Sequence, residues 1–213
     1  GGLEPSVALC VDTIFPTTAL VDLCREFAHM FPTVELRLHT ETMVAVADRV
    51  LDGTCHLGVA GPSAHVQTLE RHHLVMVRMI PVVAPEHPLA AAREPISAEQ
   101  LDQHVQIVLS ERGERRAPDT GVLSSKTWRV VDLPIKRDLL LAGLGWGNLP
   151  EHMIRADLSE RRLVPLQLVA WGGRCAPPGS RRHSPAGARD GPGDALAPQA
   201  NEGAMHARRG AGV

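Results

Sequence analysis

The stretch VALCVDTIFPTTALVDLCREFAHMFPTVELRL, residues 7–38, decides the fold class. Its first five residues form a short apolar run, which predicts a buried strand. Residues 17–31 repeat apolar side chains at spacings of three and four, which predicts an amphipathic helix that Thr17 or Thr18 can cap and Pro32 ends. The last five residues alternate apolar and polar side chains and predict a second strand. A strand, a helix and a strand in this order favour a parallel pair joined by a crossover helix.

The alternation of strands and helices continues beyond this stretch. Residues 43–51 carry a helical apolar face and residues 55–60 form a third apolar run, so the first unit is strand, helix, strand, helix, strand. A capping box at residues 97–100, together with Pro134 and Pro150, indicates further helix starts. Further strands are predicted at residues 74–84, 105–109, 128–131, 145–149 and 163–170.

These elements divide the chain into two lobes and a tail. We predict lobe I over residues 3–80, lobe II over residues 81–165, and a strand over residues 166–171 that returns to lobe I. Residues 172–213 contain only two residues of the Leu, Ile and Val kind among many Gly, Pro, Ala and Arg. Such a segment cannot bury enough apolar surface to offset its chain entropy. We therefore predict a disordered C-terminal tail, or a terminus translated in a shifted reading frame.

The composition excludes several function classes. With 22 basic and 24 acidic residues the formal net charge is −2, so this chain has no basic face for a phosphate backbone. No apolar run reaches the ~20 residues that a membrane span needs, and we predict no membrane partner. Three Trp, three Phe and no Tyr leave little for stacking on bases. The four cysteines are scattered and no signal peptide precedes them, so we predict reduced thiols and a cytoplasmic location.

The motifs that carry catalysis or cofactor binding are missing or incomplete. Residues 143–147, GLGWG, lack the glycine spacing and the preceding strand of a dinucleotide loop. Asp119 begins a single Asp-Thr-Gly, whereas an aspartic protease needs two such carboxylates. His72 and His73 point to opposite faces of a strand, and the other histidines and the cysteines lack metal-ligand spacing. We predict no catalytic residue, no cofactor and no metal.

The ends of the predicted strands are the best candidates for a ligand site. In doubly wound sheets, ligands bind outside the carboxyl ends of the strands, and helices that begin there present free N–H groups. The predicted strand ends are Asp12-Thr13, Glu41-Thr42, Gly61-Pro62, Ser110-Glu111, Asp132-Leu133 and Trp146 to Asn148. Each loop alone is explained as a turn or a helix cap, but together, in a chain of two lobes, they predict a ligand cleft.

Four ordered segments resemble the C-terminal effector-binding domain of LysR-type transcriptional regulators. They are FAHMFPTVEL at residues 27–36, VLDGTCHLGV at 50–59, VAPEHPLA at 83–90 and AGLGWGNLPEH at 142–152, followed by RLVPL at 162–166. Each segment is weak evidence alone, and their order makes the resemblance specific. It covers residues 5–168.

The resemblance implies a type 2 periplasmic-binding-protein fold. Two Rossmann-like lobes would be joined by two crossover strands, here near residues 79–83 and 163–168, with a small-molecule effector between the lobes. It also implies an effector-sensing and oligomerising domain that forms a homodimer or homotetramer, with the helix at 17–31 available for an interface. Promoter DNA would bind only through a helix-turn-helix, which we expect in the parent protein and not in these residues, because the chain begins at Gly1 already in the sensory domain.

The predicted effector-binding residues combine the strand ends with the resemblance. They are Asp12, Thr13, Glu41, Thr42, Met43, Gly61, Pro62, Ser110, Asp132 and Trp146. Asp12 and Glu41 bring negative charge to positions that are often neutral in the family, so a dicarboxylate would be repelled. We expect a small, partly aromatic or hydroxylated effector that carries hydrogen-bond donors. His56 departs from the family, which usually has Asp there, and the tail lacks the apolar stripe of the family's last lobe I helix.

Two alternatives use the same two-lobed fold. A solute-binding protein of a transport system needs an export signal, and a small enzyme needs a convergent acid–base pair. Asp12 and Glu41 are the only acids near the predicted cleft that would form such a pair. We predict a regulator that is not an enzyme.

Overall fold

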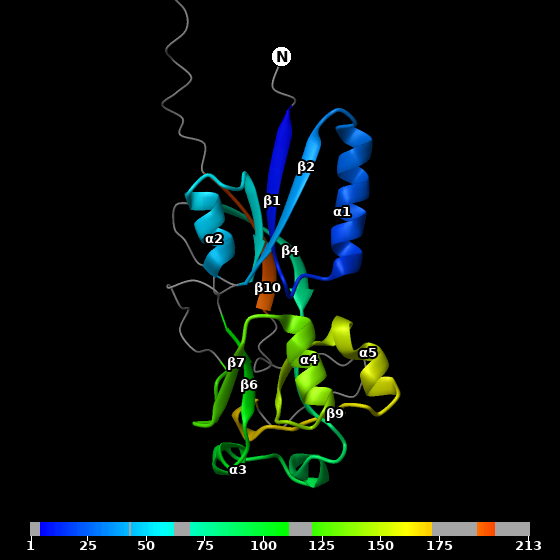
Figure 1. The fold of residues 1–213 in the computed structure, drawn as a ribbon, viewed down its shortest axis with the longest axis vertical. Coiled ribbons are helices and arrows are strands. Elements are labelled where there is room, and N and C mark those ends of the chain that lie inside the picture. The colour runs from blue at the N-terminus through cyan, green and yellow to red at the C-terminus, as the bar shows by residue number, and fades with distance from the viewer. Residues whose placement is uncertain (1–4, 43, 62–68, 111–120, 172–190, 199–213) are drawn as a thin grey trace, which may run out of the picture.

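The computed structural model describes residues 5–42, 44–61, 69–110, 121–171 and 191–198. These residues form two lobes that are stacked along the long axis of the molecule (Figure 1). Strand β4 (Leu69–Val77) belongs to lobe I and strand β5 (Met79–Val83) begins lobe II, with Arg78 between them. The two-lobed α/β architecture agrees with the prediction.

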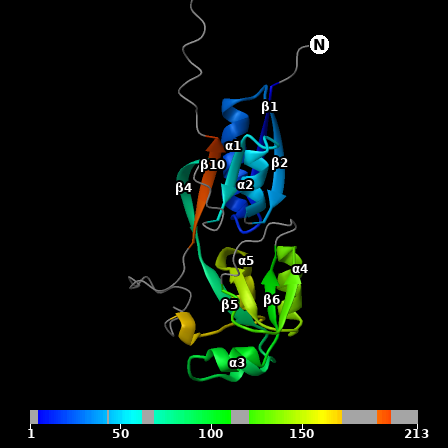
Figure 2. The same cartoon turned by 90° about the vertical axis from the view of Figure 1, so that its left-hand side faces the viewer.

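Lobe I is a five-stranded sheet with helices on both faces. Its elements are β1 (Ser6–Asp12), α1 (Thr17–Met30), β2 (Glu35–Glu41), α2 (Val44–Leu51), β3 (Leu57–Ala60), β4 and β10 (Gly191–Pro198). The strand order is β2-β1-β3-β10-β4, with β1 parallel to β2 and β3, and β10 antiparallel to β3 and β4. Figures 1 and 2 show α1 and α2 on opposite sides of this sheet.

The alternating side chains of β1 account for the two helical layers. Cys10 lies in a buried cluster with Val46 of α2, whereas Leu9 and Val11 lie in a second cluster against which Leu20 of α1 packs. Helix α1 covers its face incompletely, because none of its residues is fully buried. The outer side of lobe I therefore ends in an amphipathic helix that keeps part of its apolar surface exposed.

Lobe II contains a three-stranded sheet, β8-β5-β9, and a two-stranded sheet, β6-β7. Its elements after β5 are η1 (Pro88–Ala91), α3 (Ala98–Asp102), β6 (Gln106–Leu109), β7 (Thr127–Val130), α4 (Leu133–Leu141), β8 (Gly147–Pro150), α5 (Glu151–Ser159), β9 (Val164–Pro165) and η2 (Val169–Trp171). A parallel bridge between Gln106 and Trp146 aligns the two sheets.

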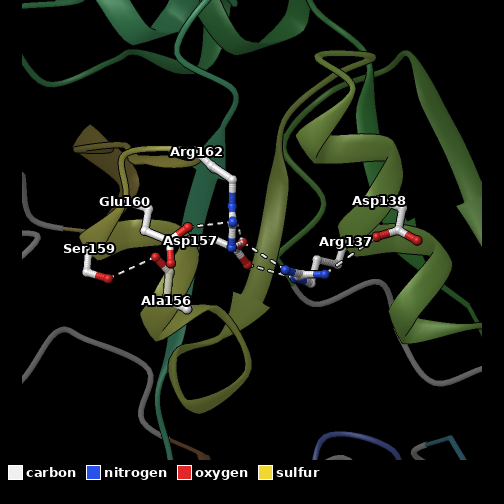
Figure 3. A network of polar contacts seen from close by, with 7 residues as sticks. All are labelled: Arg137, Asp138, Ala156, Asp157, Ser159, Glu160 and Arg162. Atoms are coloured by element: carbon white, nitrogen blue, oxygen red, sulfur yellow. Dashed lines mark hydrogen bonds and ion pairs between the residues drawn. The ribbon is translucent and has the colours of Figure 1, made fainter.

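A buried carboxylate holds α4 against α5 (Figure 3). Asp157 of α5 is fully buried and accepts hydrogen bonds from Arg137 of α4 at 2.7 and 2.8 Å and from Arg162 at 3.0 and 2.7 Å. Burial by itself raises the pKa of Asp157, but the hydrogen bonds from the two guanidinium groups outweigh it and hold the pKa below its ordinary value. The position of α4 is thus fixed by a satisfied ionic network.

The strand ends of the two lobes face each other. β10 runs antiparallel to both β3 and β4, so β4 runs in the same direction as β1, β2 and β3, and all four point their carboxyl ends toward lobe II. In lobe II, Met79 at the start of β5 pairs with Pro150 at the end of β8, and β6 and β7 run parallel to β8. The carboxyl ends of β6, β7 and β8 therefore point toward lobe I.

The predicted helix boundaries are largely confirmed. Ser97 and Gln100 form the capping box of α3, Pro134 lies in the first turn of α4, and Pro150 precedes α5. The predicted threonine cap of α1 is wrong. Pro16 is the residue before the helix and no side chain caps it, because Thr17 already lies in the first turn.

The C-terminal part of the chain differs from the prediction in two places. Residues 166–171 do not return to lobe I, because Leu166 and Leu168 are buried in lobe II and Leu168 pairs with Ile96. Within the tail that we predicted to be disordered, residues 191–198 form β10, whose backbone pairs with β3 and β4. Backbone pairing between two existing strands needs no apolar stripe, which is why composition missed it. Residues 172–190 and 199–213 lie outside the described residues.

Candidate functional site

The end of β1 forms the lobe I side of the candidate site. Asp12 is 2% exposed, and its Oδ1 accepts a hydrogen bond from the N–H of Ile14 at 3.1 Å. This turn brings the side chain of Ile14 onto the apolar cluster of lobe II. The N–H of Thr13 donates to the carbonyl of Glu41 at 3.0 Å, so the ends of β1 and β2 are joined.

Thr13 and Thr42 bring two hydroxyl groups to these joined strand ends. Thr42 follows Glu41 directly and is 2% exposed, and its carbonyl accepts a hydrogen bond from the N–H of Ala45 at the start of α2. Oγ1 of Thr13 and Oγ1 of Thr42 are both buried, and neither has a hydrogen-bond partner in the part of the chain that the structure describes. A buried hydroxyl without a partner costs about 1–3 kcal/mol, so a ligand that satisfies these groups is favoured to bind here.

Glu41 and Gly61 complete the lobe I side. Oε1 of Glu41 accepts hydrogen bonds from Nε and Nη2 of Arg49 at 3.2 and 3.0 Å, and this contact raises the pKa of Arg49. The carboxylate of Glu41 is therefore paired within lobe I, and its contact with Arg49 connects β2 to α2. A Cβ placed on Gly61 would lie 3.6 Å from Cδ1 of Ile14 and 3.7 Å from Oδ2 of Asp12, so Gly61 lies against the turn after β1.

Ser110 and Asp132 follow the strands β6 and β7 of lobe II, whereas Asn148 is the second residue of β8, whose carboxyl end is Pro150. The N–H of Ser110 donates to the carbonyl of Val130 at 2.7 Å, and the side chain of Asp132 caps α4 by accepting from the N–H of Ile135 at 2.9 Å. Asn148 lies on β8, and its Oδ1 is buried without a partner among the described residues. Sequence reasoning named Asn148 as part of a strand end but did not select it as a site residue. Its unpaired oxygen adds a third buried acceptor to those of Thr13 and Thr42.

The buried lysine Lys136 was missed by sequence reasoning. It lies in the first turn of α4, is 4% exposed, and has no hydrogen bond or ion pair to any described residue. Burial lowers the pKa of Lys136 to about 7. The available signal was its position three residues after Leu133 and four before Leu140, which places it on the buried face of the helix.

Three of the predicted contacts are not placed at the site by the described residues. Trp146 is fully buried in the lower core of lobe II, and its Nε1 donates to Oγ of Ser124 at 3.1 Å, while that hydroxyl donates to the carbonyl of Leu101 at 2.8 Å. The ring packs within this core and its N–H is hydrogen-bonded there, so Trp146 does not belong to the candidate site. Met43 and Pro62 lie outside the described residues.

His56 stands at the position where the resemblance leads us to expect Asp. Its Nδ1 accepts a hydrogen bond from the N–H of Ala8 at 2.9 Å. The ring therefore ties the start of β3 to β1 and does not reach the strand ends that face lobe II.

No group of three His, Cys, Asp or Glu residues could hold a metal ion in the described ranges. Over the same residues, no helix has the length and apolar character to cross a membrane.

Comparison with known proteins settles the family. The family model described as "LysR substrate binding domain" matches residues 1–183 of this chain. The chain belongs to this family. Its members form the substrate-binding part of LysR-type transcriptional regulators, as the ordered segments indicated.

Similar curated proteins are transcriptional regulators. The chain is 28% identical over 157 residues to the HTH-type transcriptional regulator AceR of Acinetobacter baumannii, covering 73% of this chain and 52% of AceR. It is 28% identical over 167 residues to the probable HTH-type transcriptional regulator YhaJ of Escherichia coli, covering 76% of this chain and 55% of YhaJ. The LysR substrate-binding chain thus spans about half the length of these relatives.

Solved regulatory domains share the fold. The regulatory domain of CcmR from Synechocystis PCC6803, in complex with 2-PG, has a TM-score of 0.68 at 13% identity, covering 92% of this chain and 88% of CcmR's. The regulatory domain of MetR, a LysR family regulator from N. meningitidis, has a TM-score of 0.66 at 17% identity, covering 91% and 84%.

Proposed function

We propose that this LysR substrate-binding domain binds a small-molecule effector between its lobes and thereby changes how the full-length protein binds promoter DNA. The observation that carries the proposal is the pair of buried, unpaired hydroxyl groups of Thr13 and Thr42 at strand ends that face lobe II. The solved CcmR regulatory domain with 2-PG supports a small-molecule ligand for this fold. DNA is contacted by a helix-turn-helix of the full-length protein.

The effector acts by shifting a population of conformations. A ligand that contacts both lobes binds the closed form more tightly than the open form, so it favours closure. Arg78 lies at the crossing between the lobes; its carbonyl accepts from the N–H of Glu151 at 2.8 Å, and its guanidinium contacts the carboxylate of Glu151 at 3.4 Å. A change in lobe angle at this crossing alters how subunits pair and how attached DNA-binding heads are spaced.

The proposed contacts come from both lobes. Lobe I supplies Asp12, Thr13, Thr42 and Gly61, with Met43 and Pro62 retained as predictions, and lobe II supplies Ser110 and Asn148. Glu41 and Asp132 serve these contacts indirectly, because Glu41 ties α2 to β2 and Asp132 caps α4.

The experiment is a thermal-shift screen of this domain against small hydroxylated and aromatic metabolites. A compound that raises the Tm of the wild type is expected to have little effect on Thr42→Val, because the hydroxyl that meets the ligand is gone. Thr33→Val is the matched control, since Thr33 is exposed in the turn after α1. An equal shift in both variants and the wild type would place the ligand elsewhere and refute the proposal.

We also propose that the domain pairs with a second copy. Val21, Met30 and Phe31 on or beside α1 are exposed apolar side chains, and Trp128 and Ile135 are exposed on lobe II. Helix α1 has no buried residue, so this exposed apolar surface is available for an interface with a second copy of the domain. Sedimentation of the wild type as a dimer, with Phe31→Glu shifted toward the monomer, supports this; a monomeric wild type at micromolar concentration refutes it.

We place this regulator in the cytoplasm and assign it no catalytic role. Cys10, Cys24 and Cys55 are free thiols, as expected in a reducing compartment. The carboxylates that an enzyme would need are already engaged, Asp12 by the N–H of Ile14 and Glu41 by Arg49.

A further inference from the structure

Ile14 is a side chain of lobe I that packs on the core of lobe II. The described residues form four apolar clusters, and three of these stay within one lobe. The fourth is the lobe II core, which includes Ile107, Leu133 and Ile154. Among the described residues, Ile14 is the one member of this fourth cluster that comes from lobe I. The apolar contact between the lobes therefore depends on a single side chain.

The turn after β1 holds Ile14 in this position. The carbonyl of Asp12 accepts a hydrogen bond from the N–H of Phe15 at 2.9 Å, and Oδ1 of Asp12 accepts from the N–H of Ile14 at 3.1 Å. An aspartate favours such a turn because its side chain reaches the backbone two residues on. Phe15 is 9% exposed and lies in the lobe I cluster with Leu9 and Val11. Neighbouring side chains of one turn thus contact different lobes.

The same turn belongs to the candidate site. Thr13 directly precedes Ile14, and its Oγ1 is buried without a partner in the part of the chain that the structure describes. The N–H of Thr13 donates to the carbonyl of Glu41, which joins the turn to the end of β2. Cδ1 of Ile14 lies beside Gly61, the residue after β3, because a Cβ built on that glycine would lie 3.6 Å from it. A ligand that moves this turn therefore also moves the contact with lobe II.

We propose that Ile14 is a latch between the lobes, whose contact with the lobe II core holds the ligand-free domain at its resting lobe angle. This inference rests on the proposed function and names the residue through which a ligand at Thr13 changes that angle. Burial of apolar surface is not directional, so the contact can persist over a range of angles and weaken as the lobes separate. Ile14→Ala removes three carbon atoms and is expected to shift the equilibrium toward separated lobes by roughly tenfold.

The test is hydrogen–deuterium exchange of this chain without ligand, followed by mass spectrometry. Residues 127–136 cover β7 and the start of α4, at the end of lobe II that faces lobe I. Their amides are expected to exchange several-fold faster in Ile14→Ala than in the wild type, with Ile14→Val in between. Leu20→Ala is the matched control, because Leu20 is a partly buried side chain whose cluster lies within lobe I. It is expected to speed exchange in lobe I alone.

A second measurement follows the lobe angle itself. Small-angle X-ray scattering is expected to give a larger radius of gyration for Ile14→Ala than for the wild type, and an unchanged one for Leu20→Ala. An unchanged exchange rate at residues 127–136 in Ile14→Ala overturns the inference, as does an equal acceleration there in Leu20→Ala. If Ile14→Ala does not fold, Ile14→Val takes its place, and wild-type exchange in that variant overturns the inference.

Failure of this inference is distinguishable from failure of the proposed function. The exchange and scattering measurements contain no ligand, so a negative result refutes the latch and leaves the proposed effector site, which the thermal shift of Thr42→Val tests. A compound that stabilises the wild type and Thr42→Val alike refutes that site and leaves the contact of Ile14 with lobe II in place.

Discussion

Arg137 of α4 and Asp157 of α5 are joined by two short hydrogen bonds, from Nε to Oδ2 at 2.7 Å and from Nη2 to Oδ1 at 2.8 Å. The carboxylate is fully buried, whereas the two guanidinium groups that contact it reach solvent. This contact holds α4, the helix that carries Lys136, against α5. The position of Lys136, in the first turn of α4, thus depends on an ion pair between two helices.

We predict that Asp157→Asn lowers the free energy of unfolding by about 2 kcal/mol, because two charged donors lose a buried acceptor and remain partly hydrated. Since the pKa of Asp157 is lowered in the folded state, its contribution is present above the ordinary value of 3.8 and is lost as the pH falls through the folded value. Urea unfolding at pH 7 measures the loss. Asp138→Asn is the control, because Asp138 is 73% exposed and lies 3.6 Å from Arg137. A loss of equal size in both variants would contradict the prediction.

A second prediction concerns the pH dependence of stability. The pKa of Lys136 lies at about 7 in the folded protein, below its ordinary value of 10.5. Between these values the unfolded chain holds a proton that the folded chain lacks, so stability gains with rising pH, by up to about 1.4 kcal/mol per unit. Below pH 6 both states are protonated and this gain disappears.

The measurement is the difference in unfolding free energy between the wild type and Lys136→Met from pH 6 to pH 9. Taking the difference removes the contributions of groups that both proteins share, such as Cys10, whose pKa burial raises to about 12. The unfolding free energy of the wild type is expected to increase relative to that of Lys136→Met as the pH rises. A flat difference would show that Lys136 is not buried as a charge in solution.

Gly147 gives a third prediction. A Cβ there would lie 2.7 Å from the carbonyl oxygen of Ile107, a backbone atom that cannot move aside, so Gly147→Ala is expected to cost about 1–3 kcal/mol. Gly61→Ala is the control, since its nearest atoms lie at 3.6 and 3.7 Å and its stability is expected to stay within about 1 kcal/mol of the wild type. Chemical denaturation of both variants decides it, and a Gly147→Ala protein as stable as Gly61→Ala would contradict the geometry.

An element of the fold was predictable where the spacing of apolar residues within that element alone identifies it as a strand or a helix. The run at residues 7–11 and the helical face at 17–31 carry their own periodicity, and both elements lie where that periodicity predicts. Leu166 and Leu168 also show a strand-like alternation, but alternation does not tell which lobe receives the buried side chains. β10 has no such pattern, because pairing through the backbone does not depend on side chains.

The site was predictable in part for a related reason. Thr13 and Thr42 follow strands, and the rule that ligands bind at strand ends finds them without a structure. Lys136 was missed because a charged residue in a helix is ordinarily solvated, and only its burial without a partner distinguishes it. Trp146 was selected because aromatic rings are scarce, and scarcity does not reveal that Ser124 satisfies its N–H within the core.

Thr42 gives the last prediction, in which stability and binding change in opposite directions. Its hydroxyl is buried without a hydrogen-bond partner among the described residues, so replacing it by the methyl group of valine removes an unsatisfied polar atom at nearly constant volume. Thr42→Val is therefore expected to raise the free energy of unfolding of the ligand-free domain by about 1 kcal/mol and to weaken effector binding. Thr33→Val, at an exposed position, is expected to change neither. Thermal and urea unfolding without ligand measure the first effect, and a Thr42→Val domain that is clearly less stable than Thr33→Val would show that the hydroxyl is satisfied in solution and is not available for a ligand.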